Sequence, residues 1–182
     1  MKRISVFAGS SAGNDPAFTE HTKKLGAAFA EKNIELVYGG AQSGLMGVLA
    51  DAILEAGGKV TGIMPTPLFE KEIVHQGLTQ FIEVDTMHQR KEKMSELADG
   101  FIALPGGFGT FEELFETITW AQIGLHVKPI GVFNIEGYYT PLMELLDHAI
   151  EAGFVPAANR SLLIESTESR DLLSLLENKA DE

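Results

Sequence analysis

The sequence predicts an α/β fold in which a doubly wound, mostly parallel sheet of about seven strands carries helices on both faces. Short apolar runs rich in β-branched residues alternate with longer segments of helical period, a pattern typical of parallel strands joined by crossover helices. The runs are β-branched and apolar, as strands covered on both faces require. No linker, repeat or shift in composition divides the 182 residues. We therefore expect one domain over residues 1–182, with a frayed tail at residues 178–182.

The expected strands are the apolar runs, and the expected helices are the amphipathic segments between them. The strands lie at residues 4–8, 35–38, 59–64, 81–84, 100–104, 129–133 and 162–165. The helices lie at residues 16–32, 45–56, 87–98, 111–124, 139–152 and 168–179. Asp15 and Thr140 each stand directly before a proline, which predicts an N-cap followed by proline at the first helical position. Glycines mark helix ends at Gly57, Gly58 and Gly153.

Charge and composition exclude several classes of protein. Fourteen basic against twenty-six acidic residues leave a formal net charge of −12, which repels a polyanion, so we expect no nucleic-acid polymer as a partner. The sequence has no cysteine, which excludes disulfides, thiolate zinc sites and a cysteine nucleophile. The first apolar stretch is too short for a signal peptide, and no run reaches the roughly 18 residues of a membrane span. We expect a cytoplasmic protein with no membrane partner.

Three glycine-rich turns follow expected strands, at residues 9–13, 39–44 and 105–110. Carboxyl ends of parallel strands meet at one edge of a sheet, where Rossmann-like folds bind their ligands. Glycine lets the backbone approach a ligand closely, and the helix that follows offers unpaired N–H groups. Each turn alone is equally explained as a tight connection. The three together predict a phosphate cradle built without lysine.

Familiar nucleotide motifs are incomplete in these turns. Gly39 and Gly44 have the spacing of a P-loop, but Leu45 stands where its lysine is needed, so an ATPase is not expected. Glu112 occupies the third glycine position of a dinucleotide fingerprint, which disfavours a nicotinamide dehydrogenase. The five histidines lack the spacing of a zinc hydrolase, and no Gly-x-Ser-x-Gly elbow is present. No metal is expected.

An acidic cluster, Glu112, Glu113 and Glu116, opens the helix expected after the third turn. Residues 110–113 also fit a capping box, in which the Thr110 hydroxyl accepts from the N–H of Glu113 and the Glu113 side chain reaches back. Capping would explain these residues without any ligand. Because one carboxylate can cap while another faces a ligand, a role in binding stays open.

Three cations, Arg90, Lys91 and Lys93, lie in the first turns of another expected helix, where the helix dipole prefers acids. Two interpretations are open: a solvated basic face, or an arginine fork directed at phosphate or at the acidic cluster. Glu72 is a further candidate, although a lone surface glutamate is usually only solvated.

Residues 105–113, Pro-Gly-Gly-Phe-Gly-Thr-Phe-Glu-Glu, resemble the Pro-Gly-Gly-x-Gly-Thr-x-x-Glu motif of the LOG (lonely guy) family. Its members are cytokinin riboside 5′-monophosphate phosphoribohydrolases, often mislabelled lysine decarboxylases. The resemblance covers nearly the whole chain, and further matches lie at residues 38–40, 44–47, 87–91, 119–122, 126 and 128–129. Ala41 departs from it, since many members have a third glycine there.

The resemblance implies a doubly wound fold, a homodimer whose partner chain helps to complete the site, and a nucleoside 5′-monophosphate substrate. The reaction it implies is hydrolysis of the N-glycosidic bond of adenosine 5′-monophosphate, often N6-substituted, to the free base and ribose 5-phosphate. Arg90 and Glu113 are then the expected catalytic pair. Together with the glycine turns, the expected substrate contacts are Ser10, Gly39, Gly40, Glu72, Lys91, Gly107, Phe108, Gly109, Thr110, Glu112 and Thr119.

The residues present suit hydrolysis of an N-glycosidic bond. Breaking a ribosyl bond passes through an oxocarbenium-like state, which a carboxylate stabilises while it orients or deprotonates the attacking water. Glu113 suits that role, whereas Arg90 could hold the phosphate, position Glu113 or assist the departing base. No cofactor is needed. Two other functions are open: a non-catalytic nucleotide-binding or signalling module, and a pyridoxal-phosphate lysine decarboxylase, for which no lysine stands in a recognisable cofactor site.

Overall fold

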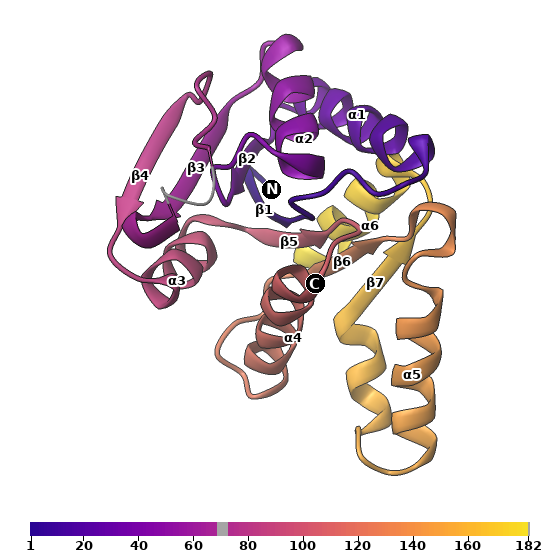
Figure 1. The fold of residues 1–182 in the computed structure, drawn as a ribbon. Helices are drawn as coiled ribbons and strands as arrows, with labels where there is room; N and C mark the ends of the chain where they lie inside the picture. The colour runs from indigo at the N-terminus through magenta and orange to yellow at the C-terminus, as the bar shows by residue number, and fades with distance from the viewer. Residues whose placement is uncertain (69–72, 182) are drawn as a thin grey trace.

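The computed structural model describes residues 1–68 and 73–181, and seven parallel strands form its single sheet (Figure 1). The strands are β1 (Arg3–Phe7), β2 (Glu35–Tyr38), β3 (Val60–Pro65), β4 (Gln80–Val84), β5 (Gly100–Ala103), β6 (Ile130–Phe133) and β7 (Leu163–Ser166). The helices are α1 (Pro16–Glu31), α2 (Gly44–Glu55), α3 (Met87–Leu97), α4 (Phe108–Gln122), α5 (Thr140–Glu151) and α6 (Ser169–Ala180). Short 3₁₀ turns are η1 (Thr66–Leu68), η2 (Ile135–Gly137) and η3 (Ala157–Leu162). The predicted fold class is confirmed.

The strand order is β4-β3-β2-β1-β5-β6-β7, so the chain starts in the middle of the sheet and winds outward in both directions. Strand β1 pairs with β2 on one side and with β5 on the other. The winding direction therefore changes between β1 and β5. In such sheets the ligand crevice lies beyond the carboxyl ends of the strands at this point.

Helices cover both faces of the sheet. Helices α1, α2 and α6 lie on one face, and α3, α4 and α5 lie on the other (Figure 1). On the first face Leu25, Ile53 and Leu172 are fully buried in one core cluster. On the second, Phe101 and Leu114 belong to another. Apolar packing on both sides explains why the strands carry continuous apolar runs instead of an alternating pattern.

Most helix boundaries lie within one residue of the sequence prediction, and the differences that matter concern helix starts and the C-terminal end. Asp15 caps α1 as predicted, since its carboxylate accepts from the N–H of Ala17 at 2.9 Å. Thr140 is not an N-cap: α5 begins at Thr140 itself, whose hydroxyl accepts from the Asn134 amide at 3.1 Å. Helix α4 starts at Phe108, three residues earlier than expected, and α6 continues to Ala180, into the expected tail.

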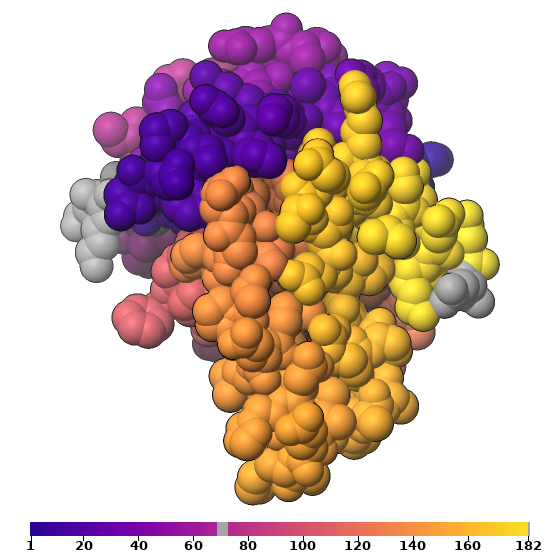
Figure 2. Space-filling model, turned by 90° about the vertical axis from the view of Figure 1, so that its right-hand side faces the viewer, coloured from indigo at the N-terminus to yellow at the C-terminus, as the bar shows by residue number. Residues whose placement is uncertain are grey.

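Helix α5 and the segment after it extend away from the sheet, and Figure 2 shows them as an orange projection at the lower end of the molecule. Two large apolar side chains in this region are exposed, Leu145 at 57% and Phe154 at 87%. None of the helices in the described part of the chain has both the length and the apolar character needed to cross a bilayer.

Candidate active site

The three glycine turns meet at the carboxyl edge of the sheet, as predicted. The N–H of Gly9 donates to the carbonyl of Pro105 at 3.1 Å, and the N–H of Leu45 donates to the carbonyl of Gly9 at 3.0 Å. A Cβ at Gly44 would lie 2.3 Å from the backbone of Ser10. Only glycine allows the turns after β1 and β2 to pack this closely.

The carbonyl groups of the turn before α4 all accept hydrogen bonds from within the protein. The carbonyl of Pro105 accepts from Gly9, that of Gly106 accepts from the Tyr138 hydroxyl, and that of Gly107 accepts from the N–H of Phe111. Within residues 1–68 and 73–181, the backbone amides of residues 106–110 donate no hydrogen bond. These amides, together with the positive end of α4, lie where the sequence predicts an anion cradle.

The predicted capping box is absent from this helix start. The N-cap of α4 is Gly107, so Thr110 is the third helical residue instead of the cap. Its side chain is buried against Gly106, where an added Cβ would lie 2.1 Å from the Thr110 hydroxyl. Because the helix already begins at Phe108, Thr110 does not occupy the N-cap position that a Thr-x-x-Glu pattern normally marks. Glu113 is therefore not engaged as a capping partner of Thr110.

Arg90 of α3 and Glu113 of α4 form a buried ion pair beside the cradle. Their side chains are 9% and 10% exposed, and Nη2 of Arg90 lies 3.7 Å from Oε1 of Glu113. Nη1 of Arg90 contacts the sulfur of Met87 at 3.8 Å, while Nε is buried with no hydrogen-bond partner among the described residues. A guanidinium carries five donors, and buried donors are normally paired. The arginine is thus placed to receive a further acceptor.

Gly39 provides the seat for Arg90. A Cβ at Gly39 would lie 1.9 Å from Nη2 of Arg90, so any larger residue would displace the guanidinium. The next residue, Gly40, has φ +80° and packs against the backbone of β3, which suits glycine alone. Both glycines are buried. They therefore lie beneath the site and support it, rather than lining its surface.

Arg90, Glu113 and the cradle border one hollow of about 210 Å³, which we call the amide cleft. Six predicted substrate contacts line it with them: Ser10, Gly107, Phe108, Gly109, Thr110 and Glu112. Met46 and Met87 also line the cleft, although neither was predicted as a substrate contact. An adjoining hollow of about 280 Å³ shares Ser10 and Gly107 with the cleft and is bordered by Tyr138. Tyr138 was also missed, although its place shortly after β6 could have suggested it.

Lys91 lies between α3 and α4 instead of in the amide cleft. Its Nζ donates to Glu112 at 2.5 Å and to Glu116 at 3.0 Å. Burial lowers the pKa of Lys91, but the hydrogen bonds and charges of the two glutamates outweigh this and raise the pKa above its ordinary value. In the described structure Lys91 therefore ties α3 to α4 and fixes Glu112 at the cleft.

Thr119, like Gly39, Gly40 and Lys91, does not line the amide cleft. Thr119 lies on α4 in a separate hollow of about 130 Å³ between α4 and α5, and its hydroxyl donates to the carbonyl of Phe115. Glu72 lies outside the described residues.

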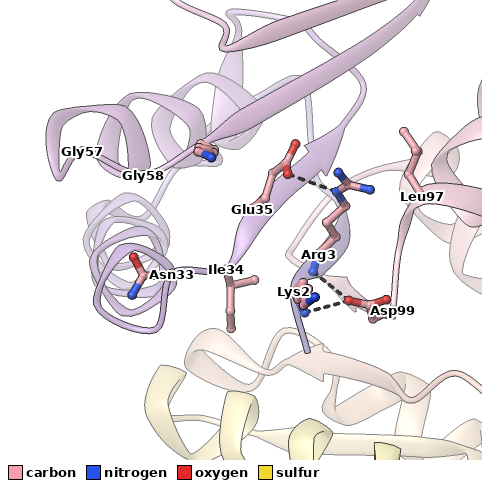
Figure 3. A pocket seen from close by; sticks show the side chains of 10 residues that line it. Lys2, Arg3, Asn33, Ile34, Glu35, Gly57, Gly58, Leu97 and Asp99 are labelled. Carbon is pink, nitrogen blue, oxygen red and sulfur yellow. Dashed lines mark hydrogen bonds and ion pairs between the residues drawn. The ribbon is translucent and has the colours of Figure 1, made fainter.

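A larger hollow of about 510 Å³ lies at the opposite edge, at the amino ends of β1, β2, β3 and β5 (Figure 3). Its acidic residues are already engaged. Glu35 binds Arg3 and Thr61, and Asp99 accepts the backbone amides of Lys2 and Arg3. Burial opposes ionisation of both carboxyls, but these contacts hold their pKa values below the ordinary range. This edge lacks the converging glycine turns, so the amide cleft is the better candidate site.

We predict that Gly39→Ala displaces Arg90 and weakens binding of adenosine 5′-monophosphate by about 10- to 100-fold, the range for hydrogen bonds to charged groups. The backbone at Gly39 is outside the left-handed region, so alanine should not strain it. Titration calorimetry measures the affinity. Ser43→Ala, in the same turn but remote from the Arg90 contact, is the control. Unchanged affinity in the Gly39 variant would contradict the role of Gly39 in placing the Arg90 guanidinium.

Lys91→Met should lower the free energy of unfolding by about 1 kcal/mol near pH 8, because two ion pairs are lost. The raised pKa gives the sign of the pH dependence. The stabilisation is complete below the ordinary lysine pKa of about 10.4 and disappears as the pH rises through the higher folded value. Urea unfolding from pH 8 to 11 measures the difference between the parent and the variant, which should shrink. Lys93→Met, which removes a more exposed pair with Glu96, should show a smaller effect, and a difference growing with pH would refute the assignment.

The sequence is similar to a known protein family over most of its length. The family model described as "Possible lysine decarboxylase" matches residues 46–176. Cytokinin riboside 5′-monophosphate phosphoribohydrolase LOG2 of Arabidopsis thaliana is 46% identical over 97% of this chain and 83% of that protein. The LOG1 protein of the same plant is 44% identical over 98% and 84%. The probable phosphoribohydrolase LOGL9 of Oryza sativa subsp. japonica is 41% identical over 97% and 78%.

Solved structures with the same fold are more distant in sequence. The molybdenum cofactor carrier protein of Chlamydomonas reinhardtii superposes with a TM-score of 0.74 at 18% identity, covering 100% of this chain and 99% of that one. The molybdenum cofactor binding protein of Rippkaea orientalis has a TM-score of 0.71 at 20% identity, with coverage of 97% and 96%. At these identities the likeness concerns the fold alone.

Proposed function

This chain belongs to the LOG family of cytokinin riboside 5′-monophosphate phosphoribohydrolases, and we propose that it uses Arg90 and Glu113 as its catalytic pair. It is a hydrolase that cleaves the N-glycosidic bond of adenosine 5′-monophosphates, including those with N6 substituents, to release the free base and ribose 5-phosphate. We further propose that residues 1–182 act as one catalytic domain in the cytoplasm.

The single observation that carries the residue assignment is the buried arginine with an unused donor beside Glu113. Arg90 and Glu113 are both buried, and both border the amide cleft. Burying a charged pair is costly unless further hydrogen bonds satisfy it. A ligand with a phosphate or an acceptor nitrogen would supply the missing acceptor. The pair therefore supports a site for an anionic, hydrogen-bonding substrate.

The geometry suits cleavage of a ribosyl bond. The amides of residues 106–110 would hold the 5′-phosphate at the start of α4. Glu113 lies one turn further along the same helix, where its carboxylate would stabilise positive charge on the ribose and orient or deprotonate the attacking water. Phosphate binding contributes remote energy that fixes the sugar over the carboxylate. This arrangement predicts a preference for monophosphates over nucleosides.

Arg90 can assist this step in two ways from its observed position. Its guanidinium lies close enough to Glu113 to orient that carboxylate. Its unused donor can also bind the phosphate or a nitrogen of the departing base. Phe108, which is 92% exposed at the rim of the cleft, offers an aromatic face for the base.

Neither Lys91 nor Lys128 supports the decarboxylase of the family description. Pyridoxal phosphate would need a lysine amine able to form an imine. Lys91 is instead held between Glu112 and Glu116, which favour its charged form. Lys128 is engaged as well, since its Nζ donates to the carbonyl of Ser95 at 2.6 Å.

Glu113→Gln should lower turnover of adenosine 5′-monophosphate by about 10²- to 10⁴-fold, the range for a lost general base. Binding should persist, because the cradle and Arg90 are unchanged. Chromatographic release of adenine measures turnover, and calorimetry measures binding. Glu92→Gln, on the exposed side of α3, is the matched control. Undiminished turnover in the Glu113 variant would remove the role assigned to it.

The same assay separates the alternatives when it is extended to isopentenyl-AMP, the nucleosides, GMP, CMP and UMP. Release of base from adenine monophosphates, and little from nucleosides, is the expected pattern. Binding of adenosine 5′-monophosphate with no base released over a long incubation would favour a non-catalytic nucleotide-binding module.

We also propose a homodimer formed through the α4 and α5 side of the molecule. Most exposed large apolar side chains lie between residues 108 and 154, among them Phe115, Leu145 and Phe154. An apolar surface of this kind is typical of an interface. Thr119 lies on the same side, in the hollow between α4 and α5. In a dimer it would contact substrate bound to the partner chain.

Leu145→Lys should convert the dimer to a monomer, because it places a charge in the apolar surface, and turnover should fall with it. Size-exclusion chromatography with light scattering measures the mass. Leu175→Lys, at a 44% exposed apolar residue on α6, should leave the dimer intact. A dimeric and fully active Leu145 variant would place the interface elsewhere.

A further inference from the structure

Two adjacent tyrosines between β6 and α5 donate hydrogen bonds to the turn that precedes α4. The Tyr138 hydroxyl donates to the carbonyl of Gly106, and the Tyr139 hydroxyl donates to the carbonyl of Leu104 at 2.6 Å. Both tyrosines lie outside the sequence motif of the turn. Because they hold different peptide groups, their effects on the cradle differ.

The peptide group held by Tyr138 joins two glycines. In a trans peptide the C=O and the following N–H point in opposite directions. A hydrogen bond to the carbonyl of Gly106 therefore turns the N–H of Gly107 away from Tyr138. Tyr138 borders the adjoining hollow but not the amide cleft, whereas Gly107 borders both. The bond thus directs the Gly107 amide toward the cleft.

A peptide between two glycines has little preference of its own for one orientation, because neither residue has a Cβ to restrict rotation. Its orientation must come from an external partner. The Tyr138 ring is well placed to be that partner, because aromatic contacts hold it on several sides. It stacks on Phe111 at 6.5 Å, and it meets Phe18 at 6.0 Å and Tyr139 at 5.1 Å edge to face.

The peptide group held by Tyr139 has no N–H to direct, because it joins Leu104 to Pro105. Tyr139 is 1% exposed, and its own backbone N–H donates to Asn134 at 2.6 Å. Its hydroxyl satisfies a buried carbonyl, and the loss of such a bond costs stability. Tyr139 is therefore the natural comparison for Tyr138.

We propose that Tyr138 is a positioning residue that directs the Gly107 amide at the substrate phosphate, whereas Tyr139 only stabilises the fold. The assignment rests on the proposed function of the amide cleft. It adds a residue on the far side of the turn, which acts on the substrate through a peptide group and not by direct contact.

The test compares Tyr138→Phe with Tyr139→Phe in the full-length chain, because each change removes one hydroxyl and keeps the ring. Calorimetry with ribose 5-phosphate measures phosphate binding without turnover. Tyr138→Phe should weaken this binding about 3- to 10-fold, the effect of one hydrogen bond, at an unchanged melting temperature. Tyr139→Phe should lower the melting temperature by about 2 to 10 °C and leave the affinity near that of the parent.

Kinetics with adenosine 5′-monophosphate provide an independent reading. Tyr138→Phe should raise KM by the same factor and leave kcat within about twofold, because the bond acts on binding. Parental affinity in Tyr138→Phe, or an equal loss in both variants, would overturn the assignment.

Failure of the proposed function has a different signature. If the parent binds ribose 5-phosphate but releases no adenine, the proposed hydrolase activity is wrong. The difference in ribose 5-phosphate binding between the two variants still decides the role of Tyr138. If the parent cleaves its substrate, and Tyr138→Phe matches the parent in both ribose 5-phosphate binding and kinetics, only the role assigned to Tyr138 is wrong. A parent that neither binds ribose 5-phosphate nor releases adenine would overturn both.

Discussion

The burial of the Arg90 guanidinium beside Glu113 is the constraint on which the site depends. A cation and an anion removed from water stabilise one another only in a fixed geometry. That geometry requires a glycine at position 39, because any Cβ there would occupy the place of Nη2. The turn around Gly39 is fixed in turn by residues 73–75. The N–H of His75 donates to Gly40 at 2.9 Å, and that of Gln42 donates to Ile73 at 2.9 Å.

The contacts that hold the Arg90–Glu113 pair in place involve helices on both faces of the sheet. His75 is 6% exposed; its ring accepts from the N–H of Gly77 and lies 2.9 Å from the carboxylate of Asp51 on α2. On the other face, Lys91 ties α3 to α4 through Glu112 and Glu116. Each catalytic candidate is thus held by an element that does not carry it. A substitution several residues from the cleft can therefore alter its chemistry.

The fold class could be predicted from the sequence because parallel strands that are covered on both faces form continuous apolar runs. All seven strands were identified in this way. Helix starts were harder. Residues 110–113 match a capping box in type and spacing, yet the helix begins earlier because Gly107 can serve as the N-cap. Thr140 fits the same local rule but is engaged with Asn134, a contact that only the folded chain creates. Local patterns name candidate caps, and tertiary contacts decide among them.

The site was foreseen in its residue types and less so in its arrangement. The motif resemblance pointed to Arg90 and Glu113, and the structure places them side by side. It did not indicate that Gly39 lies beneath the arginine, or that Lys91 is engaged with two glutamates, because both facts depend on how α3 packs across the sheet edge. Thr119 and Tyr138 depend on α5 and on the turn after β6, which carry no recognisable motif.

The proposed anion cradle of backbone amides would also make phosphate binding independent of the protonation state of the protein. Peptide N–H groups neither gain nor lose a proton in the range where the chain stays folded, unlike the histidines or lysines of other phosphate sites. The ionisation that remains is that of the ligand, since a phosphate monoester takes its second negative charge near pH 6. Affinity at the start of α4 should thus follow the dianion fraction of the nucleotide. The acidity of the medium would be sensed by the substrate itself.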